Sequence, residues 1–138
     1  MKILIIGAGK MGEAVLNRWL CKTSRFKKII SVVENNTKRI NILKKNYTNI
    51  EIEKEIPYFW KGDLILFAIK PQVFLDVAKE INSKNIKANI ILSIMAGITI
   101  NSLEKTINSK AILFRAMPNL ASNIGEGMTG VFSKKSTK

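Results

Sequence analysis

Short apolar runs, each about as long as a buried strand, recur along the chain. They occur at residues 2–6, 29–33, 64–69, 89–94 and 111–114. Continuous apolar runs of this length are typical of parallel strands that are covered on both faces. Residues 50–53 instead alternate between polar and apolar side chains, which predicts one further short strand.

Between these runs, apolar side chains recur at three- and four-residue spacing, which predicts helices. The predicted helices cover residues 11–22, 37–47, 72–82 and 100–107. Thr37 is the expected cap of the second helix, and Lys70 and Pro71 are expected to end the strand before the third. Strands alternating with helices predict an α/β fold with a doubly wound, mostly parallel sheet.

The composition is that of an ordinary globular domain. The chain has 138 residues, of which 46% are hydrophobic and 24% charged, with only three prolines. We expect residues 1–132 to form the domain and residues 133–138 to be a polar, frayed tail. These totals exclude a disordered, collagenous or disulfide-stapled chain.

The cysteine count and the first residues bear on location. Cys21 is the only cysteine, so it has no partner for an internal disulfide, and no cluster of cysteine and histidine is present to hold a metal. The first apolar run is interrupted by Gly7, Gly9 and Lys10, too early for a signal peptide or a spanning helix. We therefore expect a cytoplasmic protein with no membrane partner.

The formal net charge of +13 raises the question of nucleic acid, because clustered lysine and arginine neutralise phosphates. The basic residues are scattered over every segment rather than gathered on one recognition helix. This distribution disfavours a dedicated nucleic-acid function. A positive potential would still attract an anionic cofactor.

The most informative motif follows the first predicted strand. Gly7, Gly9 and Gly12, with Lys10 and Met11 between the last two, match the pattern G-x-G-x-x-G and open a predicted helix. In a dinucleotide-binding fold the first glycine turns the chain, the second lets a pyrophosphate approach the backbone, and the third permits close helix packing. The helix N-terminus then supplies free N–H groups to the phosphates, so the motif predicts a Rossmann-type dinucleotide-binding domain.

An acidic side chain is expected about twenty residues further on, at the end of the second strand, where it binds the adenosine ribose. Glu34 occupies that place and would favour NAD over NADP. The polar residues that follow could donate to the extra phosphate of NADP; they are Asn35, Asn36, Thr37, Lys38 and Arg39. The cofactor is therefore NADP(H) or NAD(H), with the choice left open.

Three more segments stand where predicted strands end, at the edge where open α/β sheets bind ligands. They are Ala68-Ile69-Lys70-Pro71-Gln72, Ser93-Ile94-Met95-Ala96-Gly97-Ile98-Thr99 and Arg115-Ala116-Met117-Pro118-Asn119. With the glycine motif before them and Gly125-Glu126-Gly127-Met128-Thr129-Gly130 after them, the chain resembles the amino-terminal, cofactor-binding domain of pyrroline-5-carboxylate reductase.

The resemblance implies a function. Members of that family use a nicotinamide cofactor to reduce 1-pyrroline-5-carboxylate to L-proline, the last step of proline biosynthesis. Motif and resemblance together give as cofactor-binding residues Gly7, Gly9, Lys10, Met11, Gly12, Glu34, Asn35, Asn36, Ala68, Lys70, Pro71, Ala96 and Gly97. The residues implied to shape the pocket for nicotinamide and substrate are Met117, Pro118, Asn119 and Thr129.

The chain contains no histidine, the commonest general acid or base, which disfavours a histidine-dependent hydroxyacid dehydrogenase. Reduction of a cyclic imine demands less, because the imine nitrogen is basic enough to arrive protonated from water. The site then has mainly to align the hydride donor with the carbon.

The resemblance implies a helical dimerisation domain after the region of Gly130, and we expect this chain to lack that domain. Since that domain contributes to the substrate site, we expect dinucleotide binding to be retained more readily than turnover. A complementing chain that carries the helical domain is one expected partner. The alternatives are a non-catalytic dinucleotide-binding module or remnant, and a related small-molecule reductase of the same clan.

Overall fold

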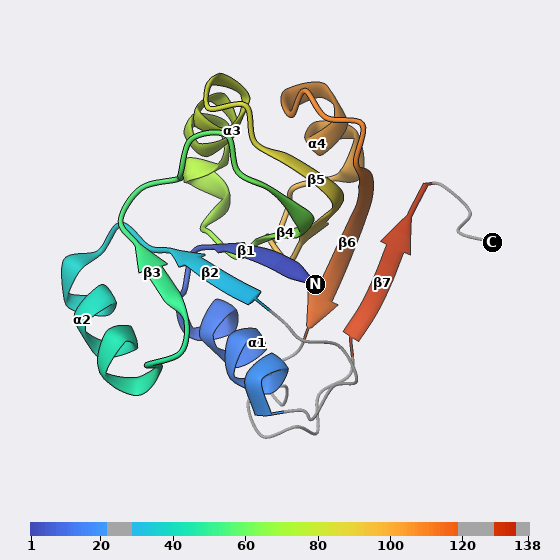
Figure 1. Cartoon of the computed structure of the whole chain (residues 1–138). Helices are drawn as coiled ribbons and strands as arrows, with labels where there is room; N and C mark the ends of the chain where they lie inside the picture. The colour runs from blue at the N-terminus through green and yellow to red at the C-terminus, as the bar shows by residue number, and fades with distance from the viewer. Residues whose placement is uncertain (22–28, 119–128, 135–138) are drawn as a thin grey trace.

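The computed structural model describes residues 1–21, 29–118 and 129–134, which form one seven-stranded sheet with helices on both faces (Figure 1). The strands are β1 (Lys2–Ile6), β2 (Ile29–Val33), β3 (Glu51–Glu53), β4 (Lys61–Phe67), β5 (Lys87–Ser93), β6 (Ile112–Pro118) and β7 (Thr129–Ser133). The helices are α1 (Lys10–Cys21), α2 (Thr37–Asn46), the 3₁₀ turn η1 (Pro71–Val73), α3 (Phe74–Ser83) and α4 (Ile100–Thr106).

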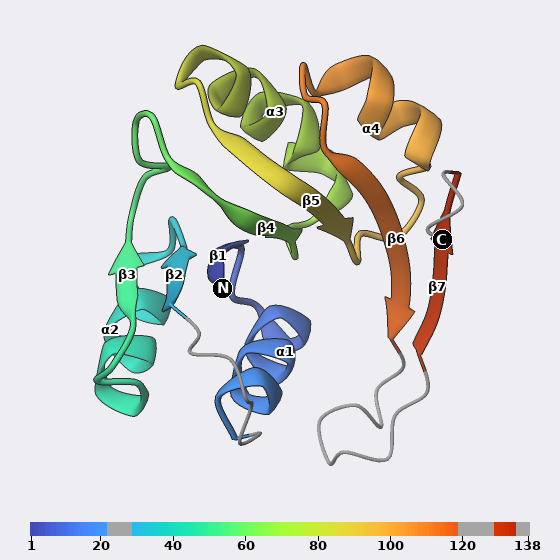
Figure 2. The same ribbon diagram turned by 45° about the vertical axis from the view of Figure 1, so that its right-hand side comes forward.

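The strand order across the sheet is β3-β2-β1-β4-β5-β6-β7. The first six of these strands are parallel, and β7 lies beside β6 and runs in the opposite direction (Figure 2). The chain therefore builds outward from β1 to one edge and then, starting with β4, to the other. This order confirms the predicted doubly wound, Rossmann-type fold and places its switch point between β1 and β4.

Two apolar cores explain why the strands are apolar throughout. In β1, Ile3 and Ile5 belong to the core beneath α1 and α2, whereas Leu4 and Ile6 belong to the core beneath α3 and α4. All four side chains are at most 2% exposed. Burial of each contributes about 1.5–3 kcal/mol, so a strand with two covered faces favours an uninterrupted apolar run.

The predicted strand at residues 64–69 is displaced in the structure. β4 begins at Lys61 and ends at Phe67, so Ala68 and Ile69 lie beyond it. Its first residues are polar but pair with β5, where Lys61 lies opposite Lys87. The pattern of apolar residues did not predict the polar first residues of β4, because backbone hydrogen bonds to β5, rather than burial, stabilise that end of the strand.

The predicted cap of the second helix is wrong by one residue. The N-cap of α2 is Asn36, whose Oδ1 accepts a hydrogen bond from the backbone N–H of Arg39 at 3.1 Å. Thr37 is instead the first helical residue. Both residue types are good caps, and the extended backbone of Asn36 decides between them.

The last predicted strand, at residues 111–114, is too short. β6 continues to Pro118, so Arg115, which the sequence placed just after the strand, lies within it, opposite Phe132 of β7. β7 itself was not predicted, because its residues are mostly exposed and form no apolar run. The division into a domain of residues 1–132 and a tail of residues 133–138 stays a prediction.

Candidate functional site

The turn between β1 and α1 requires glycine at its first position. Gly7 has a φ of +90°, and its N–H donates to the carbonyl oxygen of Val33 at 2.8 Å. A Cβ on Gly7 would lie 2.7 Å from both the carbonyl oxygen of Ala68 and the side chain of Ile69. Gly7 thus turns the chain away from β1 in a space that no larger residue fits.

The third glycine of the motif brings α1 close to the sheet. A Cβ on Gly12 would overlap the carbonyl oxygen of Gly7 and would come within 3.0 Å of the Ala68 side chain. Gly12 is also buried. Close packing of helix against strand therefore depends on this residue, which is the part expected of it from the motif.

The second glycine is different, because the fold does not need it. Gly9 is exposed, and a Cβ built on it has no described atom within 4 Å. Neither crowding nor a positive φ accounts for glycine there. What glycine does provide is bare backbone beside the start of α1, where a ligand can approach closely.

The first N–H groups of α1, next to Gly9, have no acceptor within the helix. The first helical hydrogen bond runs from the N–H of Glu13 to the carbonyl oxygen of Gly9, at 2.9 Å. Lys10, Met11 and Gly12 therefore have no acceptor inside the helix for their N–H groups. With the positive end of the helix dipole, these groups can bind an anion.

Glu34 follows β2 and reaches across to the same turn. Its Oε2 accepts a hydrogen bond from the N–H of Ala8 at 3.0 Å, and its Oε1 accepts one from the N–H of Asn36 at 2.9 Å. Asn36 and Asn35 are exposed, whereas Glu34 is half-buried. The predicted ribose-binding carboxylate is thus fixed in orientation beside the glycine turn.

Arg39 and Glu13 form a link that the sequence did not predict. The guanidinium of Arg39 is paired with the Glu13 carboxylate, and its Nε donates to the carbonyl oxygen of Ala8 at 2.8 Å. Tyr47 donates from its hydroxyl to the other Glu13 oxygen, at 3.3 Å. Arg39, one of the donors suggested for an NADP phosphate, is therefore already engaged by the protein.

The segment after β4 lies against the glycine turn from the other side. The N–H of Ala68 donates to the carbonyl oxygen of Ile6 at 2.8 Å, and the Ala68 backbone lines the space around Gly7. Lys70 is exposed, has an extended backbone and precedes Pro71, the first residue of η1. Ala68 is therefore a packing neighbour of the turn, and Lys70 is a cation at the same edge of the sheet.

The remaining predicted residues lie further along this edge. Ala96 and Gly97 follow β5 in an exposed turn, where Gly97 has a φ of +74°. Met117 is 53% exposed near the end of β6. Thr129, the first residue of β7, lies opposite Pro118. Asn119 falls outside the described residues.

The sheet thus brings all the described site residues to one edge but not to one point. The glycine turn, Glu34 and Ala68 are linked by hydrogen bonds or packing contacts. Met117 is three strands from β1 in the sheet order, or about 14 Å at the usual strand spacing. Such an arrangement suits an extended ligand that lies across the carboxyl ends of the strands.

A groove at the opposite edge of the sheet is separate from these residues. It has a volume of about 510 Å³ and is lined by the start of β4 and β5, including Lys61, Lys87 and Asn89. Since ligands of open α/β sheets bind at the carboxyl ends of the strands, this groove is not the candidate cofactor site.

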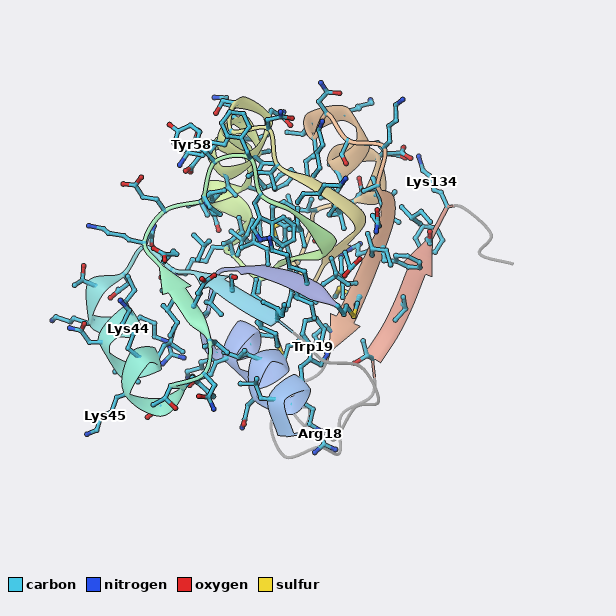
Figure 3. The ribbon with its side chains drawn as sticks, in the orientation of Figure 1. Arg18, Trp19, Lys44, Lys45, Tyr58 and Lys134 are labelled. Carbon is cyan, nitrogen blue, oxygen red and sulfur yellow. The ribbon has the colours of Figure 1, made fainter. Side chains whose placement is uncertain are left out.

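Basic side chains lie on several elements of the described structure. Figure 3 shows Lys44 and Lys45 on α2, Arg18 on α1 and Lys134 beyond β7 in separate parts of the molecule. Within the described segments, no helix has the length and apolar character needed to span a bilayer. In residues 1–21, 29–118 and 129–134, no three potential metal ligands of the Cys, Asp or Glu type gather in a group.

Comparisons with known proteins agree with this geometry. The chain is 30% identical to a pyrroline-5-carboxylate reductase of Haemophilus influenzae, over 98% of the chain and 49% of that protein. Its structure is similar to that of a pyrroline-5-carboxylate reductase from Coxiella burnetii, with a TM-score of 0.79 and 20% identity over 99% of the chain and 50% of that structure. The chain spans about half the length of the curated relatives it matches.

A solved pyrroline carboxylate reductase of Plasmodium falciparum, which has NADP bound, is also similar, with a TM-score of 0.68 and 21% identity over 100% of the chain and 48% of that structure. The similarity to the amino-terminal domain of these reductases is confirmed. A family profile described as "NADP oxidoreductase coenzyme F420-dependent" matches residues 2–97, and its description agrees with the predicted nicotinamide dinucleotide. Because the profile covers most of the chain, the chain belongs to this family of NADP oxidoreductases.

Proposed function

We propose that this chain is the NAD(P)H-binding part of a pyrroline-5-carboxylate reductase, an enzyme that transfers a hydride to 1-pyrroline-5-carboxylate and yields L-proline. The observation that carries the proposal is the open backbone at Gly9 beside the first N–H groups of α1. The Haemophilus influenzae reductase named above, which matches nearly the whole chain, supports the choice of reaction.

The residues at the glycine turn fit a dinucleotide. Gly7 and Gly12 are required by the fold, whereas Gly9 leaves room that the protein itself does not fill. A pyrophosphate there would accept hydrogen bonds from the N–H groups of Lys10, Met11 and Gly12. The exposed side chain of Lys10 would add positive charge beside the pyrophosphate.

The rest of the cofactor would lie along the same edge. Glu34 and its neighbours Asn35 and Asn36 would meet the adenosine ribose. The segments after β4 and β5 would line the nicotinamide half through Ala68, Lys70, Pro71, Ala96 and Gly97. The substrate would be bound beyond them by Met117, Pro118, Asn119 and Thr129.

The bound nicotinamide supplies the hydride, and the chain supplies binding and orientation. The absence of histidine is compatible with this reaction, because a cyclic imine is protonated by water before reduction. Lys70 would attract an anionic group at the nicotinamide end through its exposed ammonium. Catalysis would then rest mainly on alignment of substrate and cofactor.

The geometry near β2 supports NAD(H) as the preferred cofactor. The Glu34 carboxylate is held at the turn by two backbone N–H donors, and a carboxylate there repels a ribose phosphate. Arg39 is paired with Glu13 rather than directed to solvent. Cytoplasmic location and a complementing chain with the helical domain remain further predictions.

Substitution of Gly9 by valine tests the proposal. A Cβ on Gly9 meets no described atom within 4 Å and the position is exposed, so we expect the variant to unfold at about the same temperature as the unmodified chain. Its binding free energy for NADH and NADPH, measured by fluorescence titration, should weaken by about 2 kcal/mol or more. The reason is that the pyrophosphate can no longer approach the backbone closely.

Gly130→Val is the matched control, since it adds the same side chain to another open glycine, on β7. ADP-ribose, which has the pyrophosphate but no nicotinamide, should distinguish Gly9→Val from this control. Equal affinities of Gly9→Val and the unmodified chain would contradict dinucleotide binding at this turn.

Turnover is tested separately, by following nicotinamide absorbance with 1-pyrroline-5-carboxylate. Oxidation of NADH or NADPH that depends on the imine would support a reductase. Tight dinucleotide binding without any turnover, even with a candidate helical domain added, would support a non-catalytic module instead.

A further inference from the structure

Ala8 is held by side chains on both of its backbone polar groups. Its N–H donates to Glu34, at 3.0 Å, and its carbonyl oxygen accepts from Nε of Arg39, at 2.8 Å. The residue is fully buried, so water cannot replace either partner. Buried backbone groups in a loop need such partners, and here α2 and the end of β2 provide them.

The contact between Arg39 and the Ala8 carbonyl also fixes the orientation of the Gly9 N–H. The carbonyl of Ala8 and the N–H of Gly9 belong to one peptide unit, which is planar and trans, so the two bonds point in opposite directions. A side chain that binds the carbonyl therefore directs the N–H of Gly9 to the other side. No described atom accepts from that N–H, and it lies next to the first N–H groups of α1.

Glu13 keeps the guanidinium in place. It pairs with Arg39 from the first turn of α1, and the two side chains are only 24% and 27% exposed. An arginine can bind a carbonyl and a carboxylate at once, because its N–H groups lie in a rigid planar fork. A lysine has one compact ammonium and would not reproduce both contacts in this geometry.

We propose, on the basis of the function proposed above, that Arg39 is a positioning residue of the cofactor site. It orients the Ala8–Gly9 peptide so that the Gly9 N–H faces the phosphates. Arg39 binds no phosphate of the cofactor itself, because its guanidinium is already occupied by Glu13 and Ala8. Both cofactors share the pyrophosphate, so Arg39 serves NADH and NADPH equally.

The test compares Arg39→Ala and Arg39→Lys in titrations with NADH and NADPH. We expect Arg39→Ala to weaken binding of both dinucleotides by the same factor, about tenfold or more. Arg39→Lys should recover only a small part of the loss. Lys45→Ala, which removes an exposed positive charge from the same helix, should stay within about twofold of the unmodified chain.

Three results would overturn the proposal. A loss for NADPH alone would make Arg39 a ligand of the ribose phosphate. Full affinity in Arg39→Lys would show that positive charge is sufficient. Unchanged binding of both dinucleotides in Arg39→Ala would show that the loop needs no such support; if that variant does not fold, Arg39→Lys decides.

The Gly9 amide gives a readout that does not depend on the cofactor. In the 15N-labelled free protein, Arg39→Lys should shift the Gly9 amide resonance, because the peptide that carries this N–H loses the Arg39 contact on its carbonyl side, while the Gly130 amide stays unchanged. An unchanged Gly9 amide contradicts the positioning role. Failure of the unmodified chain to bind either dinucleotide would overturn the proposed function, and the Gly9 amide would still decide the role of Arg39.

Discussion

The carboxylate of Glu34 and the backbone N–H of Ala8 are joined by a hydrogen bond of 3.0 Å, although 26 positions separate them in the sequence. The bond connects the end of β2 to the turn after β1. It explains how a side chain expected to bind ribose is held in place before any ligand arrives.

Replacement of Glu34 by alanine should therefore change cofactor preference. Loss of the carboxylate removes repulsion of the ribose phosphate and the acceptor for ribose hydroxyls, so we expect the ratio of NADPH to NADH affinity to rise about tenfold. The fold should lose about 1–3 kcal/mol, because the buried Ala8 N–H is left unpaired. Calorimetric titration and urea unfolding measure the two effects.

Glu53→Ala is the control, because it removes an equal charge from the exposed face of the neighbouring strand β3. It should leave the affinity ratio unaltered. An equal loss of affinity for both cofactors in Glu34→Ala would refute a ribose contact by Glu34.

Gly12→Ala should destabilise the protein through overpacking. The added Cβ would overlap the carbonyl oxygen of Gly7, so α1 must move away from the sheet at a cost of about 1–3 kcal/mol. Gly9→Ala, which adds the same methyl group to open space, should unfold like the unmodified chain. Chemical unfolding of the two variants checks the difference; equal stabilities would show that α1 is not packed as described.

Lys84 should contribute to stability in a pH-dependent way. Its Nζ donates to the carbonyl oxygen of Ile56 and binds Glu80, each at 2.7 Å, and it lies 4.7 Å from the ring centre of Tyr58. The hydrogen bond with Glu80 raises the pKa of Lys84 above its ordinary value of 10.5, although burial opposes the shift. The stabilisation is therefore complete below pH 10.5 and is lost as the pH rises through the raised pKa.

Lys84→Met should lower the free energy of unfolding at pH 8 by about 1–3 kcal/mol, since the Ile56 carbonyl and Glu80 lose their partner. Lys79→Met, whose ion pair with Asp76 is exposed, should cost no more than about 0.5 kcal/mol. Between pH 8 and pH 11 the unmodified chain should lose more stability than Lys84→Met. Parallel loss in both proteins would contradict the role of Lys84.

Lys70 and Lys61 lie near opposite ends of β4 and offer a matched pair of charge deletions. Lys70→Ala should weaken dinucleotide binding and reduce its dependence on salt, because an exposed cation at the carboxyl edge is lost. Lys61→Ala should leave binding unaltered. Stability should change by less than about 0.5 kcal/mol in both variants. Equal effects on binding would argue against a cofactor at the carboxyl edge.

The sequence predicted those parts of the fold that rest on burial. β1 and β2 were predicted residue for residue, because both of their faces are covered and the apolar run is uninterrupted. β7 was missed because its side chains are mostly exposed and pairing with β6 alone defines it. The polar start of β4 was missed for a similar reason.

In the candidate site, too, some features could be predicted from the sequence and others could not. The glycine motif predicted the turn at Gly7 and the close packing at Gly12, because those roles follow from local geometry. The pyrophosphate contact expected of Gly9 stays a prediction. The pairing of Glu13 with Arg39 was not foreseen, since the two residues come from different helices and only the tertiary fold brings them together. Charge alone gave no signal for it in a chain with 23 basic residues.

A crystal of the chain soaked with NADH tests the central claim most directly. We predict electron density for the diphosphate against the backbone of Gly9 and the first N–H groups of α1, with the adenosine ribose beside Glu34. Density for the dinucleotide elsewhere on the molecule, or a soaked crystal with this turn accessible and empty, would contradict the account.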